Sequence, residues 1–181
     1  MKKVKYEILN VVNGKEVPST IFDDAIRLVT ENSETFYIEY QFIEESFVKD
    51  GQIMIKYEGK SFYIVPHDSF FIKNNIEQIE EYIRIKSIYF KRKNLQTNHL
   101  FSYSIKGSVG YEYFEDHIEI YNKEELQSEL MLTEIKEIKN QNTAIVWINK
   151  KGDDFITHST AAQISFLKDF IGENFKNLNW E

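Results

Sequence analysis

The same order of sequence patterns occurs twice in this chain, and this repeat constrains the fold more than any other feature. From Ile145 to Phe175 the sequence has an apolar run, a glycine turn, a second apolar run, a polar junction at His158 and an amphipathic stretch. The stretch 53–65, with its junction at His67, begins an earlier copy in the same order. Each copy predicts a β-hairpin followed by a helix.

The amphipathic stretches after the two junctions have matching spacing. Apolar residues fall nine and twelve positions beyond each histidine, at Ile76 and Ile79 in the first copy and at Leu167 and Phe170 in the second. If the repeat is structural, each half is an antiparallel sheet or half-barrel closed by one helix, because a helix can cover the apolar face of a sheet. The fold class expected is therefore α+β.

Local signals along the chain predict two domains separated by the polar stretch 91–98. Thr20 and Asp23 have the spacing of a helix capping box, and apolar residues follow at helical intervals, which predicts a helix. Alternating apolar residues then predict strands. The N-terminal domain is expected over 1–93, with a helix near 19–31, strands near 36–65 and a helix near 75–86; the C-terminal domain is expected over 99–181, with a closing helix near 160–175.

Composition excludes several classes of protein. The net charge of −7 argues against general nucleic-acid binding, although Lys and Arg between 84 and 93 alternate with aromatic residues. The chain has no cysteine, which excludes disulfides and cysteine-based zinc sites. No apolar run reaches the roughly 20 residues that span a bilayer, and no signal peptide is recognised at the N-terminus. We expect a cytoplasmic protein that spans no membrane and needs no cofactor.

The strands and the closing helix of the C-terminal half resemble the bacterial pleckstrin-homology-like domains, including the YcxB-like group. The resemblance extends from about Gly110 to Phe175 and includes 111–113, 118–120, 145–147 and the last helix. In the first half, residues 65–70 resemble the junction after a strand in the same family. The resemblance implies binding through a sheet or loop surface and brings no catalytic residues. YcxB-like proteins usually carry membrane-spanning segments, which this sequence lacks.

The densest group of acid, histidine and hydroxyl residues lies at the second junction. Asp154, His158 and Ser159 suggest a small-ligand site or a hydrolase in which His158 is the general base and Asp154 orients it. The competing interpretation is a polar turn and a helix cap at Ser159 or Thr160. Histidines adjacent to single carboxylates do not provide the three or four converging ligands of a metal site, so no metal is expected.

Acidic residues in two predicted loop regions suggest a surface for a basic partner. They are Glu44, Glu45 and Asp50 in the first half and Glu124 and Glu125 in the second. Acidic loops on a small domain favour capture of a basic protein, as in immunity proteins that inhibit toxic nucleases. The leading hypothesis is therefore a non-enzymatic protein-binding module, and the alternative is the ligand site or hydrolase at His158.

Overall fold

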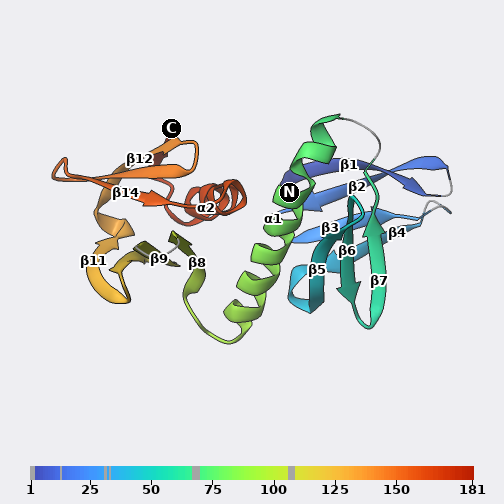
Figure 1. Ribbon diagram of the computed structural model, residues 1–181, viewed down its shortest axis with the longest axis horizontal. Coiled ribbons are helices and arrows are strands. Elements are labelled where there is room, and N and C mark those ends of the chain that lie inside the picture. Colours follow the sequence, from blue (N-terminus) through green and yellow to red (C-terminus); the bar gives the residue numbers. More distant parts are fainter. Residues whose placement is uncertain (1–2, 13, 31, 33, 67–69, 106–108) are drawn as a thin grey trace. The chain divides into compact units, whose positions relative to one another are not determined.

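The computed structural model divides the chain into two compact units, 1–91 and 92–181 (Figure 1). It describes residues 3–12, 14–30, 32, 34–66, 70–105 and 109–181. The long helix α1 (Phe70–Asn94) contains the division between the units, whereas the sequence predicted domains of 1–93 and 99–181.

The first unit consists of two antiparallel sheets followed by α1. Four strands pair in chain order, and a short 3-10 turn, η1 (Tyr40–Phe42), leads to a second sheet of three strands, also in chain order. The strands are β1 (Val4–Val12), β2 (Lys15–Phe22), β3 (Ala25–Val29) and β4 (Thr35–Glu39), then β5 (Ile43–Lys49), β6 (Gln52–Tyr57) and β7 (Lys60–Ile64).

The second unit has the same order of elements. Its four-stranded sheet, its 3-10 turn η2 (Leu132–Glu134) and its second sheet precede the helix α2 (Ala161–Asn174). The strands are β8 (His99–Ile105), β9 (Val109–Phe114), β10 (His117–Asn122) and β11 (Glu125–Met131), then β12 (Ile135–Gln141), β13 (Ala144–Asn149) and β14 (Asp154–His158). A two-residue strand, β15 (Asn179–Trp180), pairs in parallel with β12.

The predicted α+β class is confirmed, because antiparallel sheets and two helices make up the described chain. None of the four sheets closes into a barrel within the described residues. Neither α1 nor α2, as far as the structure describes them, has an apolar stretch long enough to cross a membrane.

Equivalent elements of the two units are 92 positions apart over much of their length. This offset relates η1 to η2, β5 to β12 and β6 to β13, each with identical length. The backbone also repeats in detail, because the pairing register shifts after Ile43 in one unit and after Ile135, 92 positions later, in the other. The repeat of the hairpin and helix that the sequence predicted therefore extends over both whole units.

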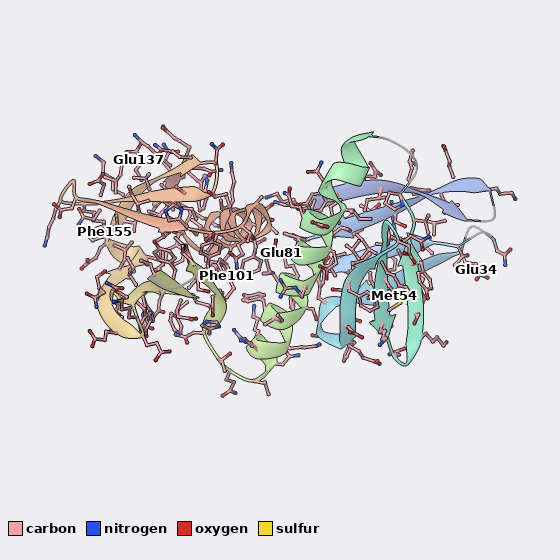
Figure 2. The ribbon with its side chains drawn as sticks, in the orientation of Figure 1. Glu34, Met54, Glu81, Phe101, Glu137 and Phe155 are labelled. Carbon is pink, nitrogen blue, oxygen red and sulfur yellow. The ribbon has the colours of Figure 1, made fainter. Side chains whose placement is uncertain are left out.

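In each unit, one row of side chains across the four-stranded sheet forms part of the core. In the first unit the row contains Ile21, Ile26 and Ile38, and the same positions in the second unit hold Tyr113, Ile118 and Leu130. All of these side chains are buried. Phe101, which is labelled in Figure 2, lies in the second unit, and its ring packs against the rings of Tyr113 and Phe166.

The helix predicted near 19–31 is wrong, because this segment forms the end of β2, a turn and β3. Asp23 and Asp24, which suggested a helix N-terminus, lie at the turn, where the Asp23 amide donates to the Lys3 carbonyl at 3.1 Å. Ile21 and Ile26 face each other across the hairpin. Apolar residues on both sides of a two-residue turn imitate helical spacing, and β-branched side chains favour the strand.

The helix predicted near 75–86 extends further in both directions, from Phe70 to Asn94. From Tyr82 to Phe90 the sequence also alternates weakly between apolar and polar residues, as a strand would. This alternation arises because Tyr82, Ile83 and Ile85 are all buried on a broad apolar face of the helix. At the second junction, Thr160 caps α2 in a reciprocal capping box with Gln163, as one of the two interpretations of that junction expected.

Glu80 on α1 gives the first unit a pH dependence that can be tested. The Ser46 hydroxyl donates to its carboxylate at 2.7 Å, but burial is the larger effect and raises the pKa of Glu80 above its usual value. The folded state therefore binds this proton more tightly than the unfolded state, and stability falls as the pH rises through the folded-state pKa.

We expect Glu80→Gln to stabilise the protein at pH 7 by about 0.5 kcal/mol, a small value because solvent screens a half-exposed carboxyl. The gain should disappear near pH 3.5, where Glu80 is protonated in both states. Urea unfolding at both pH values measures the change, with Glu77→Gln, an exposed position on the same helix, as the control. A gain of equal size at pH 3.5 would contradict the assignment to burial of charge.

Candidate binding face on the second unit

Three glutamates lie side by side on the outer face of the β8–β11 sheet. The register places Glu112 on β9 opposite Glu119 on β10, and Glu119 opposite Glu129 on β11. The inward positions next to them, Tyr113 and Ile118, are buried, so these glutamates face the other side of the sheet. We call Glu112, Glu119 and Glu129 the acidic row. Like charges opposite each other on strands about 4.8 Å apart destabilise a sheet, so this arrangement is unfavourable for folding alone.

Hydrogen bonds hold Glu112 at one end of the acidic row. His99 Nε2 lies 2.6 Å from its Oε2 atom, and the Ser102 hydroxyl donates to the same atom. The Arg92 guanidinium contacts His99 Nδ1, and since arginine can only donate, Nδ1 is the acceptor and Nε2 carries the proton for Glu112. Arg92, His99 and Ser102 thus fix the direction of one carboxylate.

Glu119, in the middle of the acidic row, is held by an aromatic hydroxyl and a second histidine. The Tyr121 hydroxyl donates to Glu119 Oε2 at 2.6 Å, and this bond raises the pKa of Tyr121 above its usual value. His117 Nε2 lies 3.6 Å from the other carboxylate oxygen, and the His117 ring stacks on Phe114 at 4.4 Å. Within the described residues these side chains form no group of three or more ligands suited to a metal ion.

A hollow of about 590 Å³ adjoins the acidic row. Gly110 lies between Ser104 and Tyr121 across the sheet, and its missing side chain leaves the face open there. The hollow combines apolar walls with two carboxylates and one ammonium; its lining residues are Ser104, Ile105, Val109, Gly110, Glu112, Tyr121, Lys123 and Glu124. Such a site can accept a side chain with an apolar stem and a cationic end.

The acidic residues of the first unit that were predicted to bind a basic partner do not form one surface in the structure. Glu44 accepts a hydrogen bond from the Gly59 amide at 2.8 Å, and Glu45 pairs with Lys56 at 2.6 Å. Asp50 lies in the turn at the opposite end of β5, with a φ of 51°. Glu44 therefore stabilises a turn, Glu45 forms a local ion pair and Asp50 lies in another turn. The three side chains do not converge on one binding site.

The two predicted acidic residues of the second unit have different positions. Glu124 lines the hollow from the β10–β11 turn. Glu125 is the exposed first residue of β11 and pairs with Asn122 across the hairpin. Only Glu124 therefore lies beside the acidic row.

The residues of the alternative hydrolase site are not brought together. Asp154 is exposed at the first position of β14 and His158 is half-buried at its last position, where its ring lies 6.2 Å from that of Tyr111. The buried Ser159 hydroxyl is used internally, because its single proton has two acceptors within reach, the Tyr113 hydroxyl at 2.8 Å and the His158 carbonyl at 2.7 Å. By strand register Val65 is the counterpart of His158; His67 lies outside the described residues.

Sequence reasoning missed the acidic row, although part of its signal was present. Glu112 lies between Tyr111 and Tyr113, and Glu119 lies between Ile118 and Ile120, which is the alternation of a half-buried strand. In the comparisons with known proteins, no family model and no curated protein matches this chain.

Proposed function

We propose that this chain is a non-enzymatic protein-binding module that captures a basic partner protein on the outer face of its β8–β11 sheet. The observation that carries the proposal is the acidic row next to a hollow lined by Glu112 and Glu124. A row of like charges weakens the sheet on which it lies, and a cationic partner would remove that repulsion. The same field would speed the encounter with a basic protein.

The hollow would receive one lysine or arginine side chain of the partner. The methylene stem would pack against Ile105, Val109 and Tyr121, and the cationic end would meet Glu112 and Glu124. Hydrogen bonds between charged groups are the strong ones, and an arginine can engage a carboxylate through two parallel bonds. His99 and Ser102 already fix Glu112, so little ordering of that side chain is needed on binding.

We further propose that each unit is a pleckstrin-homology-like half. Supporting this are the four-stranded sheet, the three-stranded sheet and the final helix, which follow the same order in both units. A fold of this kind does not define a function, and the charge and shape of the surface are what indicate the partner. An inhibitor or immunity-type protein in the cytoplasm, acting on a basic nuclease, fits an acidic face of this kind.

Neutralising the hollow should weaken partner binding selectively. Affinity capture from the native host, followed by mass spectrometry, should return a basic protein. With the purified pair, we expect Glu112→Gln combined with Glu124→Gln to raise Kd about tenfold at low salt, through loss of charge complementarity. Interferometry at two or more salt concentrations measures the affinity, and the salt dependence should decrease in the variant.

The matched control is Glu44→Gln combined with Asp50→Asn, which removes the same charge from the first unit. This control should leave Kd unchanged. If the control weakens binding as much as the hollow variant does, or if the captured partner is acidic, the proposed face is wrong.

A further inference from the structure

The outer edge of β12 is covered by a very short piece of chain. Glu181, next to β15, donates its backbone N–H to the Ile138 carbonyl at 2.9 Å and accepts from the Asn140 amide at 3.0 Å. These bonds involve only the main chain, so any extended segment can make them. The edge of β12 is therefore a strand-binding site that this segment occupies.

The occupant fills the site imperfectly. The Trp180 ring packs edge-on against the fully buried Trp147, with ring centroids 6.3 Å apart. The indole N–H of Trp180 is nevertheless buried without a hydrogen-bond partner. Buried donors almost always have an acceptor, and an unsatisfied donor weakens the contact that buries it. An aromatic side chain thus suits this position, but the indole nitrogen does not.

The first unit protects the equivalent edge in a different way. Its helix α1 has 25 residues, and Ser87 and Lys91 on this helix donate to the Ile43 carbonyl at the start of β5. Ser46, the counterpart of Ile138, donates to Glu80 on the same helix. The helix α2 has only 14 residues and ends at Asn174. Natural proteins commonly cover an exposed sheet edge. In the first unit side chains of the long helix α1 bond to β5, whereas in the second unit a few extended residues pair with β12.

A second hollow of about 590 Å³ lies next to the chain that leads into β15. Three lysines, Lys136, Lys150 and Lys176, and one acid, Glu173, line it together with other residues of the connection that ends at Leu178. An extended segment that approaches the edge from this side therefore passes three cationic side chains. Acidic residues before the aromatic position would complement them.

We propose that the edge of β12 is a docking site for an extended segment of a partner protein, acidic and with an aromatic side chain at the position of Trp180. In this assignment the segment Asn179–Glu181 is a competing occupant that closes the site in the free protein. The site is separate from the acidic row, so it does not depend on the basic partner proposed above.

The test uses the chain ending at Leu178 and a fluorescent peptide of residues 176–181, Lys-Asn-Leu-Asn-Trp-Glu. We expect this chain to bind the peptide at least about tenfold more tightly than the full chain, in which the tethered segment competes at an effective concentration in the millimolar range. Replacing the tryptophan of the peptide by alanine should abolish binding. Replacing it by 3-benzothienylalanine, an indole isostere without the N–H, should tighten binding about fivefold.

A second variant guards against misfolding of the shortened chain. The full chain with Trp180→Ala keeps the backbone of the segment and should also bind the peptide more tightly than the unchanged chain. A peptide beginning Glu-Glu in place of Lys-Asn should bind more tightly at low salt to both variants.

Three results would overturn the proposal. The first is equal binding of the peptide to the unchanged chain and to both variants. The second is binding of the alanine peptide that is as strong as binding of the parent peptide. The third is dimerisation of the full chain by exchange of this segment, which would assign the edge to a second copy.

Discussion

Replacing Ile118 by alanine is expected to destabilise the second unit by about 3 kcal/mol, since it removes three buried carbons and leaves a cavity. Ile118 is 1% exposed and lies in the core row between Tyr113 and Leu130. Ile26 is its counterpart 92 positions earlier, at 0% exposure between Ile21 and Ile38. Ile26→Ala should therefore cost the first unit a similar amount.

Hydrogen exchange measured by mass spectrometry distinguishes the two effects. Ile118→Ala should reduce protection in β9, β10 and β11, and Ile26→Ala should reduce it in β2, β3 and β4, so each variant is the control for the other. Ile156→Ala, at a side chain that is 54% exposed, should change stability by less than about 0.5 kcal/mol. Equal loss of protection in both units from either core variant would show that the chain unfolds as one cooperative body.

The closing hairpins and helices could be predicted because local signals specify them. Glycine turns interrupt apolar runs at 58–60 and 151–153, and the helices that follow have an apolar face with period near 3.6. The segment 19–31 could not be assigned in the same way. Its apolar residues satisfy helical spacing and hairpin spacing equally, and only pairing with β1 and β4 decides between them.

Part of the acidic row could have been derived from turn length. The turn at Glu115–Asp116 has two residues, and a two-residue hairpin fixes the register that places Glu112 opposite Glu119. The pairing of Glu129 with Glu119 could not be derived from turn length. The register shifts after Ile120, so a count of residues from the next turn gives the wrong partner.

The offset of 92 was also present in the sequence. Phe22 and Phe114, Ile43 and Ile135, and Ile53 and Ile145 are identical pairs at this spacing. The predicted copies were matched at their glycines and histidines, which follow β6 in the first unit and β13 in the second. The turn from β6 to β7 and the turn from β13 to β14 differ in length. Turns change length more readily than paired strands, so the alignment needed the strands as its reference.

A buried polar cluster distinguishes the two cores and predicts the second large effect. The Thr157 hydroxyl accepts from the Tyr113 hydroxyl at 2.8 Å and from the Trp147 indole at 2.7 Å. Burial raises the pKa of Tyr113 above the usual tyrosine value, at which the hydroxyl is already a donor at neutral pH. The counterparts of Tyr113, Trp147 and Thr157 in the first unit are Ile21, Ile55 and Ile64, which are all fully buried. The same three positions can therefore be filled entirely by apolar or entirely by hydrogen-bonded side chains.

Thr157→Val is expected to destabilise the second unit by about 2 kcal/mol, because the buried Trp147 indole loses its acceptor while the shape is kept. The Tyr113 hydroxyl retains the His158 carbonyl, at 3.1 Å, as an alternative acceptor. Thr157→Ser, which retains the hydroxyl, should cost only about 1 kcal/mol for the lost methyl group. In a Tyr113→Phe background the valine variant should cost about 0.5 kcal/mol less, because no tyrosine hydroxyl then has to exchange Thr157 for the longer contact with the His158 carbonyl. Urea unfolding of the unchanged chain, Thr157→Val, Tyr113→Phe and the double variant completes this double-mutant cycle. Thr133→Val, at an exposed position, is the control and should leave stability unchanged. An acceptor shared by two buried donors must couple the effects of Thr157→Val and Tyr113→Phe on the free energy of unfolding. If the two effects are strictly additive, or if Thr157→Val lowers the free energy of unfolding by less than about 0.5 kcal/mol, the cluster is a by-product of packing.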